Sequence, residues 1–93
     1  MIIGVLTASI SIPAARSLKD KRQVLRSLKD RVLGRMNVSV AEVDHQDEWR
    51  FADLAFVTVA ADSSIVQARL AELSKFLHSD PRYVLLKIET QMI

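Results

Sequence analysis

The spacing of apolar residues changes along this chain of 93 residues, and this change restricts the fold more than any other feature. From Ile2 to Ile12, β-branched and small residues alternate up to Pro13, which is typical of a strand. After Ser17, leucine and valine recur at helical spacing as far as Gly34. Ser17 with an acidic residue three positions later resembles a capping box, so we expect a helix to begin there.

The rest of the chain contains two more strand patterns, a second helical pattern and a last strand. The expected bounds are strands at Asn37–Asp44, Asp53–Ala61 and Tyr83–Ile88, and a helix from an Asp62 or Ser63 cap to Asp80-Pro81. The pattern leaves open that the last strand runs beyond Ile88. With right-handed crossovers, the order β-α-β-β-α-β predicts an α+β, ferredoxin-like two-layer sandwich. Its four-stranded antiparallel sheet would carry both helices on one face.

The composition indicates one domain spanning residues 1–93. A content of 49% hydrophobic residues is enough for a single core. There is no cysteine, which excludes disulfides, thiolate nucleophiles and cysteine-ligated metal sites. The apolar start lacks the flanks of a signal peptide, and no uncharged run approaches the roughly 20 residues that span a bilayer. We therefore expect a cytoplasmic protein without membrane contact.

The charges of the chain are strongly separated. Eight of the 13 Lys and Arg residues lie between Arg16 and Arg35 with only two acids, so this segment carries +6. The remaining five basic and nine acidic residues carry −4. Such a separation indicates an anionic partner more than a catalytic pocket.

The cations of the first helix are expected to lie beside its apolar stripe. Arg22, Arg26 and Lys29 fall on one flank of the stripe, and Arg31 and Arg35 on the other. In that position their alkyl stems can cover apolar surface, which is a purely structural interpretation. The functional interpretation is contact with several phosphates of an RNA.

Lys21 differs from these residues because its helical angle places it inside the apolar stripe. In the first turn, we expect it to project past the sheet edge beside Arg16 and Lys19, where backbone N–H groups also favour an anion. The candidate nucleic-acid or anion-binding residues are Arg16, Lys19, Lys21, Arg22, Arg26 and Lys29.

The segment from Glu42 to Glu48 holds four carboxylates and His45. Their spacing matches no structural zinc site or EF-hand, so a solvated loop is favoured over a metal site, and we expect no cofactor. Trp49 is expected to anchor this loop to the core or to a subunit interface.

Both faces of the third strand are apolar. One face carries Leu54, Phe56 and Ala60, and the other carries Ala55, Val57, Val59 and Ala61. Because a sheet face open to water should be polar, this pattern predicts a homodimer or higher oligomer through the open face.

The familiar enzyme templates are missing, including the P-loop, G-x-G-x-x-G, H-E-x-x-H and G-x-S-x-G, so we expect no enzymatic activity. RNA-recognition domains of this topology stack bases on aromatic residues of the central strands, but only Phe56 is available here. Any nucleic-acid contact is therefore expected to use the basic helix.

The helix start Ser17-Leu18-Lys19-Asp20-Lys21-Arg22 and the strand Asn37–Val43, read with Asp47 and Trp49, resemble the YlxP-like family, a bacterial domain of unknown function 503. The resemblance covers essentially the whole chain. It implies a ferredoxin-like fold and a gene neighbourhood of translation and ribosome-maturation genes. It supplies no catalytic residue.

These observations predict a non-enzymatic cytoplasmic protein associated with RNA or the ribosome, with rRNA, tRNA or a ribosomal component as partner. The alternative is a homo-oligomeric protein-interaction or small-anion-binding module without affinity for nucleic acid. Co-purifying nucleic acid and late elution from heparin would distinguish the first from the second.

Overall fold

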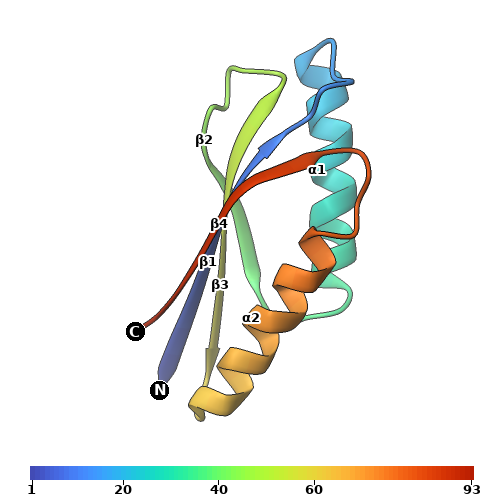
Figure 1. The fold of residues 1–93 in the computed structure, drawn as a ribbon. Helices are drawn as coiled ribbons and strands as arrows, with labels where there is room; N and C mark the ends of the chain where they lie inside the picture. The colour runs from blue at the N-terminus through green and yellow to red at the C-terminus, as the bar shows by residue number, and fades with distance from the viewer.

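The computed structural model describes residues 1–93 and contains six elements in the predicted order (Figure 1). Their bounds are β1 Ile2–Ser11, α1 Leu18–Leu33, β2 Ser39–Asp44, β3 Phe51–Ala60, α2 Ser63–Leu77 and β4 Val84–Met92. The strands form one antiparallel sheet in the order β2-β3-β1-β4, and both helices cover one face of it. This confirms the α+β ferredoxin-like fold. Neither helix is long and apolar enough to cross a bilayer.

The central strands β1 and β3 pair along their whole length, from Ile2 opposite Ala60 to Ser11 opposite Phe51. Strand β4 runs beyond Ile88 to Met92, an extension that the sequence left open, and it continues through exposed polar residues as an edge strand. Beyond its end, Ile3 and Ile93 exchange two backbone hydrogen bonds of 3.0 and 2.8 Å. The two chain termini therefore lie side by side (Figure 1).

The start of α1 has the predicted cap. Ser17 Oγ accepts a hydrogen bond from the Asp20 N–H at 3.1 Å. In return, Asp20 Oδ2 accepts one from the Arg16 N–H at 2.9 Å, one residue before the cap. Two N–H groups that the helix cannot pair are thus satisfied by side chains, which fixes where α1 begins.

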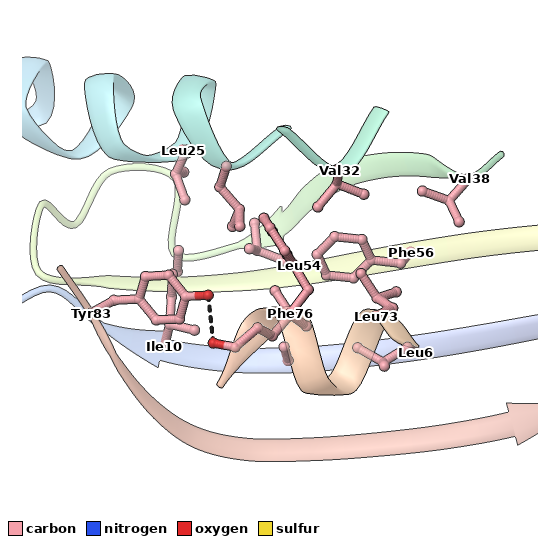
Figure 2. Packing of buried hydrophobic residues seen from close by; sticks show 14 of the residues in the cluster. Leu6, Ile10, Leu25, Val32, Val38, Leu54, Phe56, Leu73, Phe76 and Tyr83 are labelled. Atoms are coloured by element: carbon pink, nitrogen blue, oxygen red, sulfur yellow. Dashed lines mark hydrogen bonds between the residues drawn. The ribbon is translucent and has the colours of Figure 1, made fainter. Parts of the chain in front are cut away.

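A single core lies between the helices and the sheet (Figure 2). The inward residues Leu6 and Phe56 of the central strands are fully buried, and Leu73 of α2 packs with them. At one end of the core, the Tyr83 hydroxyl donates a 2.6 Å hydrogen bond to the Leu77 carbonyl. Burial raises the pKa of Tyr83 to about 12, so this hydroxyl keeps its proton at neutral pH.

Gly4 allows α2 to approach β1 closely. A Cβ at this position would overlap Val66 Cγ1 and would lie 3.2 Å from Leu70 Cδ1 and 3.3 Å from Thr58 Cγ2. Val66 is fully buried and β-branched, so its side chain has little freedom to move away. The absence of a side chain at residue 4 therefore sets the distance between helix and strand.

The variant Gly4→Ala is expected to lower the free energy of unfolding by about 1–3 kcal/mol, because it overpacks the contact with Val66. Gly34→Ala is the comparison, since Gly34 has a right-handed φ of −74° and an added Cβ there would lie 3.3 Å from the Asp30 carbonyl oxygen, a tight contact without the overlap found at Gly4. Urea denaturation measures both. Combining Gly4→Ala with Val66→Ala should cost less than the sum of the two single changes; strict additivity would contradict the overlap.

Candidate anion-binding groove

A groove runs between α1 and β2 and is lined on one side by three of the predicted cations. Its volume is about 370 Å³, and its lining residues are Arg22, Leu25, Arg26, Lys29, Asp30, Leu33 and Glu42. Arg22, Arg26 and Lys29 follow each other at intervals of four and three residues, so they share one helix face. Exposed Lys19 precedes Arg22 by three residues on the same face. These four cations extend over about 15 Å of helix.

None of the cations at this groove is neutralised by an acidic partner. Arg16, Lys19, Arg22, Arg26 and Lys29 form no salt bridge; the salt bridges of the chain involve other basic residues. Within the groove, three cations face the two carboxylates of Asp30 and Glu42. Glu42 is itself neutralised by a lysine outside the groove, as described next. The groove therefore keeps a positive excess that an anion could satisfy.

That lysine is Lys21, whose side chain is only 1% exposed. Its ammonium donates hydrogen bonds of 2.7 Å to the backbone carbonyls of His45 and Glu48. It also lies 2.6 Å from Glu42 Oε2, a buried oxygen that receives no aligned hydrogen bond. Two N–H groups are used by the carbonyls, and the ammonium charge is paired with Glu42 inside the structure, so Lys21 is not available to a phosphate.

The expectation that Lys21 projects past the sheet edge beside Arg16 and Lys19 is therefore wrong. Arg16 and Lys19 are exposed at the start of α1, whereas Lys21 points inward to the β2–β3 connection. Two signals in the sequence indicate this arrangement. Lys21 lies within the apolar stripe, and Glu42 follows Val40 at the alternate position that faces the helices. A cation and a carboxylate at inward positions must pair to be buried.

Lys21 links the N-terminal turn of α1 to the loop between β2 and β3. The same two segments lie at one end of the molecule in Figure 1. His45, which supplies one of the carbonyls, has a left-handed φ of 63°, uncommon for a residue with a side chain. The ammonium thus compensates a strained loop and holds Glu42 at the groove wall.

We expect Lys21→Met to lower the free energy of unfolding by about 3–5 kcal/mol, because it leaves the Glu42 carboxylate and two carbonyls without their partner. Lys19→Met, two residues away and exposed, should change it by less than about 0.5 kcal/mol. Urea denaturation gives the energies, and amide hydrogen exchange of residues 45–50 reports the loop. Equal stability of the two variants would remove Lys21 from this role.

The opposite flank of α1 serves a structural purpose. The guanidinium carbons of Arg31 and Arg35 each lie 5.2 Å from the centre of the Phe76 ring of α2. Arg31 also lies 3.4 Å from Asp80 Oδ2. These cations bridge the two helices by cation–π contacts and an ion pair, which leaves the groove flank as the one without partners.

Asp80 was predicted only as the end of the second helix, but the structure gives it a further function. Arg82 donates to both of its carboxylate oxygens, with a shortest distance of 2.6 Å. Hydrogen bonds from Arg82 lower the pKa of Asp80 despite its burial, and the charge of Arg31 acts in the same direction. Asp80 therefore stays ionised at neutral pH and fixes the turn before β4.

Because its pKa is lower in the folded chain, Asp80 contributes stability above its unfolded pKa of about 3.9, and this contribution disappears as pH falls through the folded value. We expect Asp80→Asn to be destabilising at pH 7, with a difference from the parent protein that shrinks progressively below about pH 4. Urea unfolding across this pH range measures the difference. A difference in the free energy of unfolding that does not change with pH would show that the charge of Asp80 is not the cause of its stabilising effect.

The loop after β2 gathers the groups that a metal ion could use. Ligand atoms of Asp44, His45 and Asp53 lie within 4.8 Å of one another. These groups contact one another, since His45 Nε2 is 3.5 Å from Asp53 Oδ2 and His45 Nδ1 is 3.5 Å from Glu48 Oε1. The cluster is accounted for by these contacts. Trp49 is 46% exposed, so it does not anchor the loop to the core, and its contact with a subunit interface stays a prediction.

The comparisons with known proteins cover nearly the whole chain. Residues 3–90 match the family described as "Protein of unknown function (DUF503)". The chain belongs to the DUF503 family. A relative, the Bacillus subtilis (strain 168) protein described as "Uncharacterized protein YlxP", is 31% identical over 80 residues, which cover 86% of this chain and 87% of that protein. The YlxP-like resemblance predicted from the sequence is thereby confirmed.

In this DUF503 domain, part of the segment that carries the resemblance is structural. Ser17 caps α1, and Lys21 and Glu42 form the buried pair that holds the loop. Lys19 and Arg22 of the same segment are exposed and unpaired, so packing does not explain them. The functional argument therefore depends on these two residues and on their neighbours along the groove.

Proposed function

We propose that this DUF503 protein binds RNA through the cationic flank of α1, as a binding protein without catalytic activity. The observation that carries the proposal is the line of unpaired cations Lys19, Arg22, Arg26 and Lys29 along one open groove. Lysine and arginine side chains in such a row bind successive phosphates with little preference for base sequence. Arg16, at the start of the helix, extends the same charged surface.

The state of the sheet supports contact through the helix. Phe56, the one aromatic residue of the central part of β3, is fully buried against the helices. On the open face, the aromatic residue of the strands is Phe51 at the end of β3, which is 43% exposed and pairs with Ser11. One aromatic residue at the end of the sheet does not form the stacking platform that RNA-recognition domains build on two central strands, so phosphate contact through α1 is the mode that the residues support.

The class of RNA follows from the resemblance rather than from the groove. The gene neighbourhood implied for the YlxP-like family favours rRNA, tRNA or a ribosomal component as the cytoplasmic partner. Crosslinking in cells, followed by identification of the attached molecule, would distinguish these partners. Recovery of protein alone would favour the alternative of an interaction module without RNA affinity.

We expect the double variant Arg22→Glu, Arg26→Glu to bind a labelled polyuridine at least about tenfold more weakly than the parent protein, because two phosphate contacts become repulsive. The slope of log affinity against log salt should become shallower by about 1.4, or about 0.7 for each lost contact. Fluorescence anisotropy at several salt concentrations measures both quantities.

The matched control is Arg50→Glu with Lys75→Glu, which changes the net charge equally at two exposed, unpaired cations outside the groove. If the control weakens binding as much as the groove variant, binding follows net charge and the groove has no special part. If the parent protein does not bind RNA, the proposal is overturned.

The groove also permits a second function, because its volume of about 370 Å³ is within the range of small-ligand pockets. A small polyphosphate held by Arg22, Arg26 and Lys29 would make this a small-anion-binding module. Calorimetric titration with tripolyphosphate tests this directly. Binding that is lost in the Arg22, Arg26 variant, together with no affinity for polyuridine, would favour the small anion over RNA.

A further inference from the structure

The face of the sheet away from the helices is ordered in rows, because strand pairing places four side chains across the sheet. One row consists of Ser39, Val57, Val5 and Gln91, from β2 to β4. The row toward the termini is formed by Val59, Ile3 and Ile93. The row on the other side is formed by Ala41, Ala55, Thr7 and Glu89. The next row contains Asp44, Asp53, Ser9 and Lys87.

The rows near the termini are apolar at their centre and open to solvent. Val57 is 40% exposed, Val59 is 50% exposed and Ile93 is 67% exposed. Ile3 and Val5 are partly exposed beside them. A contiguous apolar surface on the central strands is unfavourable in water. Such a surface usually marks a site where a partner covers it.

The row of Asp44, Asp53, Ser9 and Lys87 is charged, and its charges differ between the two sides of the sheet. Beyond it, Phe51, Ser11 and Val84 form one more row of this face, in which Phe51 is 43% and Val84 52% exposed. Lys87 lies on the β4 side, while Asp44 lies on the β2 side and Asp53 beside it on β3. These side chains line one shallow pocket of about 320 Å³ on this face. On either side of a line between β3 and β1, the face therefore carries apolar residues at matching positions. Its charges at matching positions are opposite, with a lysine on the β4 side and an aspartate on the β2 side.

We propose that a second copy of this chain covers this face, related by a two-fold axis parallel to the strands that passes between β3 and β1. This rotation exchanges the two sides of the sheet and keeps every row opposite itself. Val5 of one copy then faces Val57 of the other, and Ile3 faces Val59. Each apolar centre meets an apolar centre, as in aligned packing of two sheets.

The same rotation matches the polar ends of the rows. Lys87 of one copy faces Asp44 of the other, and Gln91 faces Ser39. Lys87 already lies 2.8 Å from Glu89 in its own strand, so in the dimer it would bridge two carboxylates. The face holds more carboxylates than ammonium groups, so the apolar rows supply the affinity and Lys87 selects the register.

The area of the face is sufficient for such a dimer. Four strands about 4.8 Å apart and about 30 Å long present a surface of roughly 600 Å² per copy. Two copies would bury about 1,200 Å², which is at the lower end of stable, specific interfaces. A two-fold axis across the strands through the row of Ala55 and Thr7 would cover a similar area, but it would set the charged row of Asp53 and Lys87 against the apolar row of Val57 and Val5.

Sedimentation equilibrium without RNA tests the proposal, with the parent protein expected at twice its monomer mass. Val57→Asp should shift the protein to monomer, because it places a carboxylate in the apolar centre. Ile65→Asp is the matched control, since Ile65 is 42% exposed but lies on α2, on the helix side of the sheet. It should leave the dimer intact.

The charged row provides a second test that does not depend on how well Val57→Asp folds. Lys87→Asp and Asp44→Lys are each expected to weaken the dimer about tenfold, and their combination should restore it, because both residues are exposed and the combination recreates the facing pair. A monomeric parent protein, or single and double variants of equal affinity, would overturn the proposal.

The proposals of RNA binding and of dimer formation can be refuted independently of each other. Dimer formation is measured in the absence of RNA, and RNA binding uses α1 on the opposite side of the sheet. The dimer should persist at salt concentrations that abolish RNA binding, because its affinity comes from apolar contact. A dimer that dissociates with salt in parallel with RNA release would contradict the apolar interface.

Discussion

The arrangement at one end of the molecule depends on the buried ammonium of Lys21. It joins two carbonyls of the β2–β3 loop and the carboxylate of Glu42 to the first turn of α1. Burying such a charge is unfavourable unless it is paired and hydrogen-bonded, and here two carbonyls accept hydrogen bonds while Glu42 supplies the opposite charge. The ammonium requires the loop to close over the helix start, and the loop requires the ammonium because its carbonyls face inward. The wall of the groove is set by this mutual dependence.

The cations of the groove have no partners because the acidic residues lie elsewhere or pair with other cations. Glu42 is committed to Lys21, and Asp80 is committed to Arg82 and Arg31. Most of the other carboxylates belong to the loop after β2 or to strands away from α1. The helix therefore keeps one flank of cations that packs against Phe76 and one that has no counter-charge. A sequence with the same net charge but a carboxylate opposite each arginine would have no such groove.

The fold was predictable because the apolar period, the Ser17 cap and the right-handed crossover rule all act locally or through general geometry. The division of the helix cations into two flanks was predictable for the same reason, since it follows from 3.6 residues per turn. The direction of Lys21 was missed because its two hydrogen-bond acceptors are backbone carbonyls, whose position cannot be read from residue types; its place in the apolar stripe and the inward Glu42 were the available signals. The end of β4 was left open because its last residues are exposed and polar, and the ion pairs of Asp80 were missed because a polar residue before a turn is typical of a loop.

The two chromophores of the chain lie at different places in this architecture. Trp49 follows Glu48, whose carbonyl is held by Lys21, whereas the only tyrosine, Tyr83, is buried at the end of the core. Tryptophan emission therefore reports the release of the loop, and tyrosine absorbance reports the opening of the core. Because regions of a protein can open separately, the chain carries two intrinsic optical reporters that separate local from global unfolding.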